Sequence, residues 1–394
     1  MNIGKRHENL ILTLCTLILA GLGAVMVYSA TSVMAKASEQ LGNDAAYFFK
    51  RQVLFLVLGV SLALILSRVD YDIIRRHIVA LMGGTLVLLV LVFVPGIRHT
   101  ANGASRWIDM WLFTFQPSEL AKFSLIAYAA YAIDRRGENF REGGRAFLSI
   151  LAVLALYVTL ILKEPDFGTA VLITTSVLAL LFIAGFPWKL LAGCGVAGIM
   201  ALVLAIVSQP YRMARISAFF DPFSQAQAAG YQVVQSLIAF SNGGLIGTGI
   251  GAGKQKLFYL PAMHTDYIFS VIGEELGFAG VVAVGACFMT LVWVGFRIAR
   301  RARDPFGKYL AMGVATMIGV QAFVNMMVGL KMLPPKGMVL PFLSYGGSSL
   351  ILHLGAIGIL TNISMKGAEV FVAAEPDNRR RGNRRARVPG DCAC

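Results

Sequence analysis

Charged residues are scarce in this chain of 394 residues. Asp, Glu, Lys and Arg make up only 14% of it, whereas 57% is hydrophobic and the mean hydropathy is +0.70. The water-facing surface of a soluble protein of this length needs many more charged side chains. The composition therefore excludes a soluble enzyme and indicates an integral membrane protein.

Cysteine is also scarce, and its five positions form no pattern. Cys15, Cys194 and Cys287 lie inside apolar runs, while Cys392 and Cys394 lie at the end of the sequence. This spacing predicts neither a disulfide framework nor a zinc site, and the last residues do not form a prenylation motif.

The hydrophobic residues fall into about ten separate runs, most of them about as long as a bilayer-crossing helix. The first run follows Lys5 and Arg6 and is too long for an ordinary signal peptide, so it is predicted to be an uncleaved first span. The fold class is thus predicted to be all-α, with about ten transmembrane helices. The spans are expected near residues 9–30, 52–67, 77–95, 118–134, 146–162, 169–186, 188–208, 267–296, 308–330 and 341–364.

Lys and Arg are unevenly divided between the two sides of the predicted membrane domain. The termini and the even-numbered connections hold 22 of them, and the odd-numbered connections hold 12. Because basic residues accumulate on the cytoplasmic side, both termini are predicted to be cytoplasmic. Topology and attraction to lipid headgroups then explain most of the net charge of +14, so no nucleic-acid partner is expected.

The chain is predicted to comprise a short cytoplasmic N-terminus (1–8), a membrane domain (9–364) and a basic, disordered cytoplasmic tail (365–394). Two outer segments are too long for simple turns: residues 96–117, and the large extracytoplasmic loop 209–265 between helices 7 and 8.

The large loop contains a possible short amphipathic helix at 231–240, followed by a glycine series at 243–253. The series superficially has nucleotide-loop spacing, but no strand precedes it. Close approach of the backbone to the membrane surface or to a lipid headgroup is favoured.

Ionisable residues inside the predicted spans need a partner or a task, because burying a charge in a bilayer costs on the order of 3 kcal/mol or more. Glu119 and Lys122 lie three residues apart on one face of span 4, close enough to pair. An internal ion pair that orients the helix is one interpretation, and a functional site is the other.

A second polar group lies between spans 5 and 6, where Lys163, Glu164 and Asp166 surround a proline. Asp166 and Thr169 can supply capping oxygens for the following helix. A capped turn and a polar site facing lipid headgroups both remain open.

The segment around the start of span 8 is the most informative. His264 and Asp266 lie at the membrane boundary, and Glu274 and Glu275 continue into the span. On one continuous helix, Glu274 would lie about 12 Å beyond Asp266 and about 80° around the axis, so the two are expected to share a cavity, with Glu275 facing another helix. Asp266 can alternatively cap the helix, and His264 is a weak metal-ligand candidate because no second histidine is near.

The connection before span 10 combines Lys336 with a glycine- and hydroxyl-rich helix entry that includes Ser344. Such an entry suits a phosphate group, although tight helix packing explains its glycines equally well.

Seven motifs together resemble the SEDS family (shape, elongation, division and sporulation), and they follow the family order over almost the whole membrane region. They are GASRWI at 103–108, QPSELAK at 116–122, EPDFGTA at 164–170, GYQVVQSLIAFSNGG at 230–244, HTDYIF at 264–269, EELG at 274–277 and KGMVLPFLSYGGSS at 336–349. Glu164 and the Lys-Gly pair at 336–337 resemble the division-type more than the elongation-type members.

The resemblance implies a ten-helix peptidoglycan glycosyltransferase that polymerises lipid II outside the cytoplasmic (inner) membrane at the division septum. It also implies a class B penicillin-binding transpeptidase and other divisome membrane proteins as partners. Asp266 matches the family's essential carboxylate, Lys122 matches a lysine thought to lie close to it, and Glu119 and Arg106 belong to family motifs. Relatives commonly carry an acid after Leu-Pro in this loop, whereas Ala262 and Met263 follow here.

Transfer from an α-linked sugar diphosphate to a sugar hydroxyl is a single inverting displacement, which needs one base and one stabilised leaving group. Asp266 is the predicted base, and Lys122 is its predicted ionic partner. The diphosphate can be neutralised by basic residues or by Mg²⁺ or Mn²⁺, for which no ligand set is readable. The basic candidates are Arg106, Lys336, Arg212 and Arg215; Glu119, Glu274, His264 and Ser344 complete the supporting set.

Three other functions remain open on the sequence. The same polar cluster could carry lipid II across the bilayer, as a flippase does. The chain could be an elongation-type polymerase, or a catalytically idle scaffold that recruits partners.

Overall fold

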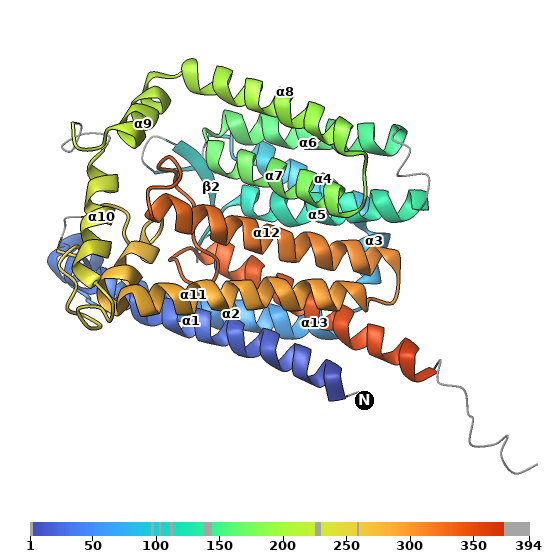
Figure 1. Ribbon diagram of the computed structural model, residues 1–394, viewed down its shortest axis with the longest axis horizontal. Coiled ribbons are helices and arrows are strands. Elements are labelled where there is room, and N and C mark those ends of the chain that lie inside the picture. Colours follow the sequence, from blue (N-terminus) through green and yellow to red (C-terminus); the bar gives the residue numbers. More distant parts are fainter. Residues whose placement is uncertain are drawn as a thin grey trace, which may run out of the picture.

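The computed structural model describes residues 3–95, 98–101, 104–110, 113–137, 144–224, 230–257 and 260–373. Long helices run roughly side by side along one axis, and a small sheet and two shorter helices gather at one end of the bundle (Figure 1). We name this the outer end, following the charge-based orientation. The helices before the sheet are α1 (Ile3–Ala37), the 3-10 helix η1 (Glu39–Leu41), α2 (Tyr47–Arg68), α3 (Asp72–Arg76) and α4 (Ile78–Leu91). Those after it are α5 (Pro117–Arg136), α6 (Arg145–Lys163), α7 (Phe167–Ile183), α8 (Trp188–Val207), α9 (Pro210–Phe220), α10 (Tyr231–Gly243), α11 (Ile268–Arg300), α12 (Pro305–Gly329) and α13 (Gly347–Ala373).

Each predicted span falls on one of the longer helices, so the all-α membrane architecture is confirmed. Within the described residues, α1, α2, α11, α12 and α13 are long and apolar enough to cross a bilayer. Four more, α4, α6, α7 and α8, are apolar but shorter. The remaining one, α5, carries Glu119, Lys122 and Asp134 and is not apolar enough by itself. Ten crossings therefore stays a prediction.

The amphipathic helix predicted at 231–240 is present as α10, and the glycine series follows it. Two glycines of the series approach helix α11, since a Cβ at Gly243 or Gly247 would collide with the α11 backbone near Gly273 and Glu275. At this contact α11 is interrupted at Gly277, whose φ of 66° and ψ of −165° suit glycine. The approach to a membrane surface or headgroup stays a prediction.

The outer segment 96–117 contains a three-stranded antiparallel sheet in the order β1-β2-β3, which the sequence did not predict. Its strands are β1 (Arg98–Ala101), β2 (Ala104–Met110) and β3 (Phe113–Phe115). Such short strands give little periodic signal. The sheet leads directly into α5, so it places β2 beside the outer ends of the helices.

The described ends of the chain lie at the opposite, inner end of the bundle (Figure 1). Glu8 near the start of α1 pairs with Arg297 at 3.0 Å and with Arg301 at 2.8 Å. The prediction that disorder begins at 365 is wrong for residues 365–373, which continue α13. An ion pair from Lys366 to Asp70 anchors this last part of the helix; residues 374–394 lie outside the described part of the chain.

Helix α5 lies inside the bundle, where it packs against α4, α6, α7, α12 and α13. Its small residues make this possible, since Ala121, Ala127, Ala129 and Ala130 are all buried. The neighbouring helices therefore surround the charged side chains near the outer end of α5.

Candidate active site

Asp266 lies just before α11, half-buried at the outer end of the bundle. Helix α11 begins after Tyr267 without a side-chain capping bond, so the carboxylate of Asp266 does not act as the helix cap. Its backbone carbonyl accepts a hydrogen bond from Asn325 Nδ2 of α12 at 3.1 Å. A Cβ at Gly337 would lie 3.1 Å from Asp266 Oδ2, so the carboxylate faces the backbone of the loop before α13.

Burial raises the pKa of Asp266 to about 6, against the opposing effects of Arg215, Arg106 and a hydrogen bond with Thr265. The negative charge of Asp166 adds to the rise. A carboxyl group with this pKa is mostly ionised at neutral pH and can accept a proton. The basic neighbours come from the sheet and from the large outer loop.

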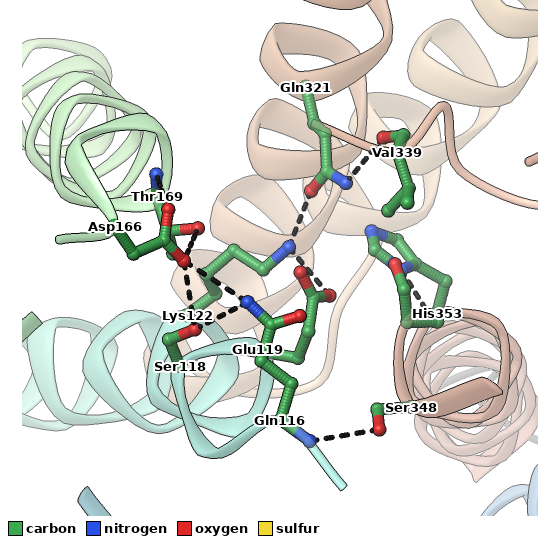
Figure 2. Close-up of polar contacts among 11 residues, drawn as sticks. Gln116, Ser118, Glu119, Lys122, Asp166, Thr169, Gln321, Val339, Ser348 and His353 are labelled. Carbon is green, nitrogen blue, oxygen red and sulfur yellow. Dashed lines mark hydrogen bonds and ion pairs between the residues drawn. The ribbon is translucent and has the colours of Figure 1, made fainter. Parts of the chain in front are cut away.

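The structure does not place Lys122 beside Asp266, which corrects the predicted pairing. Lys122 Nζ lies 2.7 Å from Glu119 Oε2 and donates to Gln321 Oε1 at 2.7 Å (Figure 2). The internal ion pair predicted between Glu119 and Lys122 is therefore confirmed. Both side chains are nearly inaccessible, and pairing offsets the cost of burying their charges.

Further hydrogen bonds extend from the buried pair into the bundle. Gln321 of α12 donates through Nε2 to the carbonyl oxygen of Val339 at 2.9 Å. His353 of α13 lies on the far side, where its Nδ1 is 2.7 Å from the carbonyl oxygen of Ser349 (Figure 2). The bonds of Lys122 and Gln321 thus link α5 to α12 and to the loop before α13.

Asp166 organises the α6–α7 turn. It caps α7 by accepting from Thr169 N at 3.1 Å and Thr169 Oγ1 at 2.8 Å, as predicted. Its Oδ2 also accepts from Gln116 Nε2 at 3.1 Å and from Ser118 Oγ at 3.3 Å (Figure 2). Asp166 therefore joins the start of α5 to the start of α7.

Arg106 of β2 ties the sheet to the same turn. Its Nε donates to the carbonyl oxygen of Glu164 at 3.3 Å, and its Nη2 donates to that of Pro165. The carboxyl oxygens of Glu164 are buried without a hydrogen-bond partner. Burial, and then Asp166, raise the pKa of Glu164 to about 9 against the effect of Arg106, so this carboxyl group is neutral.

Lys336 reaches the α6–α7 turn from the loop before α13. Its Nζ lies 5.6 Å from the centre of the Phe167 ring, and a Cβ at Gly168 would lie 3.2 Å from its Cε. Burial lowers the pKa of Lys336 to about 8, against the opposing effect of Asp166. Arg215 of α9 is an exposed cation that acts electrostatically on Asp266.

Glu274 does not share a cavity with Asp266, which corrects the sequence-based expectation. Its carboxylate accepts from the backbone nitrogen of Lys254 at 3.0 Å and from Asn242 Nδ2 at 3.3 Å. The extrapolation assumed one continuous helix from Asp266 onward, whereas α11 starts at Ile268. Glu275 faces α1, as predicted, and receives a hydrogen bond from Ser29.

Two other candidates have structural partners. The ring of His264 lies 5.2 Å from that of Phe48 and 5.8 Å from that of Tyr345, and burial lowers its pKa to about 4. Ser344 is buried and accepts from Leu340 N at 2.8 Å, so it closes a turn. The remaining candidate, Arg212, belongs to α9, and its side chain lies outside the described part of the structure.

Sequence reasoning missed Gln321 and Asn325, which connect α12 to the site. Both are buried within a long apolar run. Their spacing of four residues puts them on one helical face, and this was the available signal.

The described residues offer no ready-made site for a divalent ion. Within the described ranges, no group of three His, Cys, Asp or Glu residues comes together to hold a metal. Mg²⁺ characteristically takes many of its ligands from substrate phosphates and water. Any Mg²⁺ or Mn²⁺ would therefore depend largely on a diphosphate brought by the substrate.

The architecture defines a helical membrane protein with several ionisable side chains at one end of its bundle and a buried Glu119–Lys122 ion pair. The sequence model of the cell cycle protein family that groups FtsW, RodA and SpoVE matches residues 9–369. The chain belongs to this family.

Curated relatives match nearly end to end. A Geobacter metallireducens protein named probable peptidoglycan glycosyltransferase FtsW is 45% identical over 92% of this chain and 96% of its own length. The stage V sporulation protein E of Bacillus subtilis is 38% identical over 92% of this chain and 99% of its own.

Solved structures share the fold. A chain from the work described as "Structural coordination of polymerization and crosslinking by a peptidoglycan synthase complex" superposes with a TM-score of 0.71 at 27% identity, covering 90% of this chain and 97% of its own. The rod shape determining protein RodA of Thermus thermophilus gives a TM-score of 0.65 at 27% identity, covering 90% and 95%.

Proposed function

We propose that this chain is a peptidoglycan glycosyltransferase that polymerises lipid II into β-1,4 glycan strands. The observation that carries the chemistry is the position of Asp266, half-buried at the outer end of the bundle within the electrostatic influence of Arg106 and Arg215. Relatives that match nearly the whole chain carry the name of this activity.

Asp266 is the proposed base. It takes the proton from the 4-hydroxyl of the acceptor sugar as that oxygen displaces the diphosphate from the donor, so that one bond forms and one breaks with inversion. A diphosphate leaves without a general acid once its charge is neutralised.

Three cations are proposed to neutralise that charge: Arg106 and Arg215, which act on Asp266, and Lys336, which lies at the α6–α7 turn. Arg106 is oriented by two main-chain carbonyls through Nε and Nη2. Lys336 and Arg215 approach from the loop before α13 and from α9. Arg212 is retained as a fourth candidate on the same helix as Arg215.

Membership of the family supports a proposal for the cellular setting. We place the protein in the cytoplasmic membrane as a ten-span protein with both termini cytoplasmic, acting at the division septum. A class B penicillin-binding protein is the expected partner, since a structural relative comes from a peptidoglycan synthase complex. Other divisome membrane proteins are expected around it.

A lipid II flippase is the second candidate. The buried Glu119–Lys122 pair and its contact with Gln321 favour it, because ionisable groups inside a bundle often mark transport pathways. The similarity to a RodA structure keeps an elongation-type polymerase as a variant of the first candidate.

A polymerisation assay separates these functions. Purified protein, with and without its penicillin-binding partner, is given lipid II, and glycan length is measured for wild type and Asp266→Asn. We expect polymer from wild type and none from Asp266→Asn. The control is Asp44→Asn, which alters a partly exposed carboxylate that pairs with Lys50 and accepts from Ala46 N. If Asp266→Asn leaves polymer formation intact, or if Asp44→Asn reduces it equally, Asp266 is not the base.

Vesicles with lipid II in one leaflet test the flippase alternative. Loss of transbilayer movement in Glu119 or Lys122 variants that still form polymer supports a flippase.

A further inference from the structure

The adjacent carboxylates of Glu274 and Glu275 take part in no step of the proposed chemistry, yet both are buried to about 1% exposure. They lie near the outer end of α11 and contact the loop that follows α10. This loop, residues 244–257, leads into the segment that carries Asp266. Burying a charged group costs free energy, so two buried carboxylates outside the proposed chemistry indicate another role.

Glu274 binds backbone amides of the loop. Its carboxylate accepts from Lys254 N at 3.0 Å and from Gln255 N at 3.2 Å. Thr248 N donates to the carbonyl oxygen of Glu274 at 3.0 Å. A Cβ at Gly253 would lie 2.8 Å from Glu274 Oε2, so the loop approaches as closely as glycine allows.

Glu275 holds the same loop through an ion pair. Its carboxylate lies 3.1 Å from Lys256 Nζ and accepts from Gly251 N at 3.0 Å. Ser29 of α1 donates to it at 2.7 Å, and Lys256 also donates to the carbonyl oxygen of Gly251. Lys256 and Glu275 have side-chain exposures of 8% and 0%, so water screens this pair little.

The ion pair closes a short stretch of chain around Asp266. Lys256 is ten residues before Asp266, and Glu275 is nine residues after it. Joining both ends to each other and to Ser29 restricts the conformations of the segment between them. Asp266 is therefore held from both sides, at the cost of burying two charges.

We propose that the Lys256–Glu275 pair, together with Ser29, is a positioning clamp that fixes Asp266 against Arg106 and Arg215. Lys256 and Glu275 are positioning residues, since neither touches Asp266 or the cations of the site. The clamp joins α1 to the catalytic segment. This inference rests on the proposed polymerase function.

Two matched lysine variants test the clamp. Lys256→Met removes the buried cation, whereas Lys254→Met alters an exposed lysine of the same loop whose backbone amide keeps its bond to Glu274. We expect Lys256→Met to lower kcat for lipid II polymerisation about tenfold while KM changes less than about twofold, because binding groups remain in place. Lys254→Met should match wild type in both.

Two further measurements report the position of Asp266. Hydrogen exchange of the 251–257 amides should accelerate in Lys256→Met and stay slow in Lys254→Met. The acid limb of the kcat profile should move below pH 6, since a released Asp266 is less buried; the charges facing it are Arg106 of β2, Arg215 of α9 and Asp166 of the α6–α7 turn. A purely structural role would leave this limb unchanged.

The double variant Lys256→Met/Glu275→Gln guards against misfolding, because it removes the carboxylate that Lys256→Met leaves unpaired. It should fold as wild type yet keep the kcat defect, so the two effects should be non-additive. A folded double variant with wild-type kcat and an unmoved acid limb overturns the clamp. Absence of polymer from wild type would instead refute the function on which the clamp rests.

Discussion

Asp266 Oδ2 faces the α-carbon of Gly337, where an added Cβ would lie 3.1 Å from it. This distance is shorter than most carbon–oxygen contacts, so an added Cβ at 337 requires the carboxylate or the loop to shift by a few tenths of an ångström. The loop before α13 thus forms one wall of the site and limits the positions that the Asp266 carboxylate can take.

Gly337→Ala should therefore lower polymerisation activity without loss of fold. We expect kcat to fall several-fold, since small misplacements of a reacting group are costly. Polymer yield and thermal unfolding in detergent are the measurements. Gly285→Ala is the control, because nothing lies within 4 Å of a Cβ at that position; equal activity of the two variants contradicts the contact.

The raised pKa of Asp266 predicts two pH effects of opposite sign. Activity needs the ionised form, so kcat should decline as the pH falls through about 6. Stability moves the other way: the folded pKa exceeds the unfolded value, so stability is lost as the pH rises from about 4 to 6. Asp266→Asn should consequently raise the melting temperature at pH 7.5 and change it little at pH 4. An equal shift at both pH values would show that the carboxyl is not perturbed.

The local parts of the site could be predicted from the sequence. The Glu119–Lys122 pair depends only on a spacing of three on one helix, and the Asp166 cap depends only on the following turn. The ten apolar runs likewise report the helices directly.

Long-range relations could not be predicted. Besides its neighbour Glu119, Lys122 contacts Gln321, which is 199 residues further along the sequence but adjacent in space, as their 2.7 Å hydrogen bond shows. Glu274 was misplaced because the helix was assumed to run through Asp266 without a break, and no local pattern indicates that Glu274 instead binds loop amides.

The Glu119–Lys122 pair should be a strong stability determinant. Lys122→Met leaves Glu119 buried without its cation, which typically costs about 3–5 kcal/mol. Glu119→Gln/Lys122→Met should recover much of that loss, because it removes both charges. Thermal unfolding of the single and double variants measures the difference. If the single variant is as stable as the double one, water or another cation neutralises Glu119.

Asp166 should tune both ionisable groups that flank it. Its charge raises the pKa of Asp266 and also that of Lys336. Asp166→Asn keeps an oxygen that can cap α7 but removes the charge, so both limbs of the activity profile should move to lower pH. The pH dependence of kcat measures this shift. If only one limb moves, the charge of Asp166 does not influence the group that produces the other limb.

Lys336 should define the alkaline limit of activity. Burial lowers its pKa to about 8, so above that pH it loses the charge that neutralises the leaving diphosphate. Lys336→Arg keeps a cation at all working pH values and should flatten the decline above pH 8, while Lys336→Met should lower kcat across the whole range. Lys331→Met serves as the control, because Lys331 precedes the same loop but lies outside the site. If the alkaline limb persists in Lys336→Arg, a group other than Lys336 causes it.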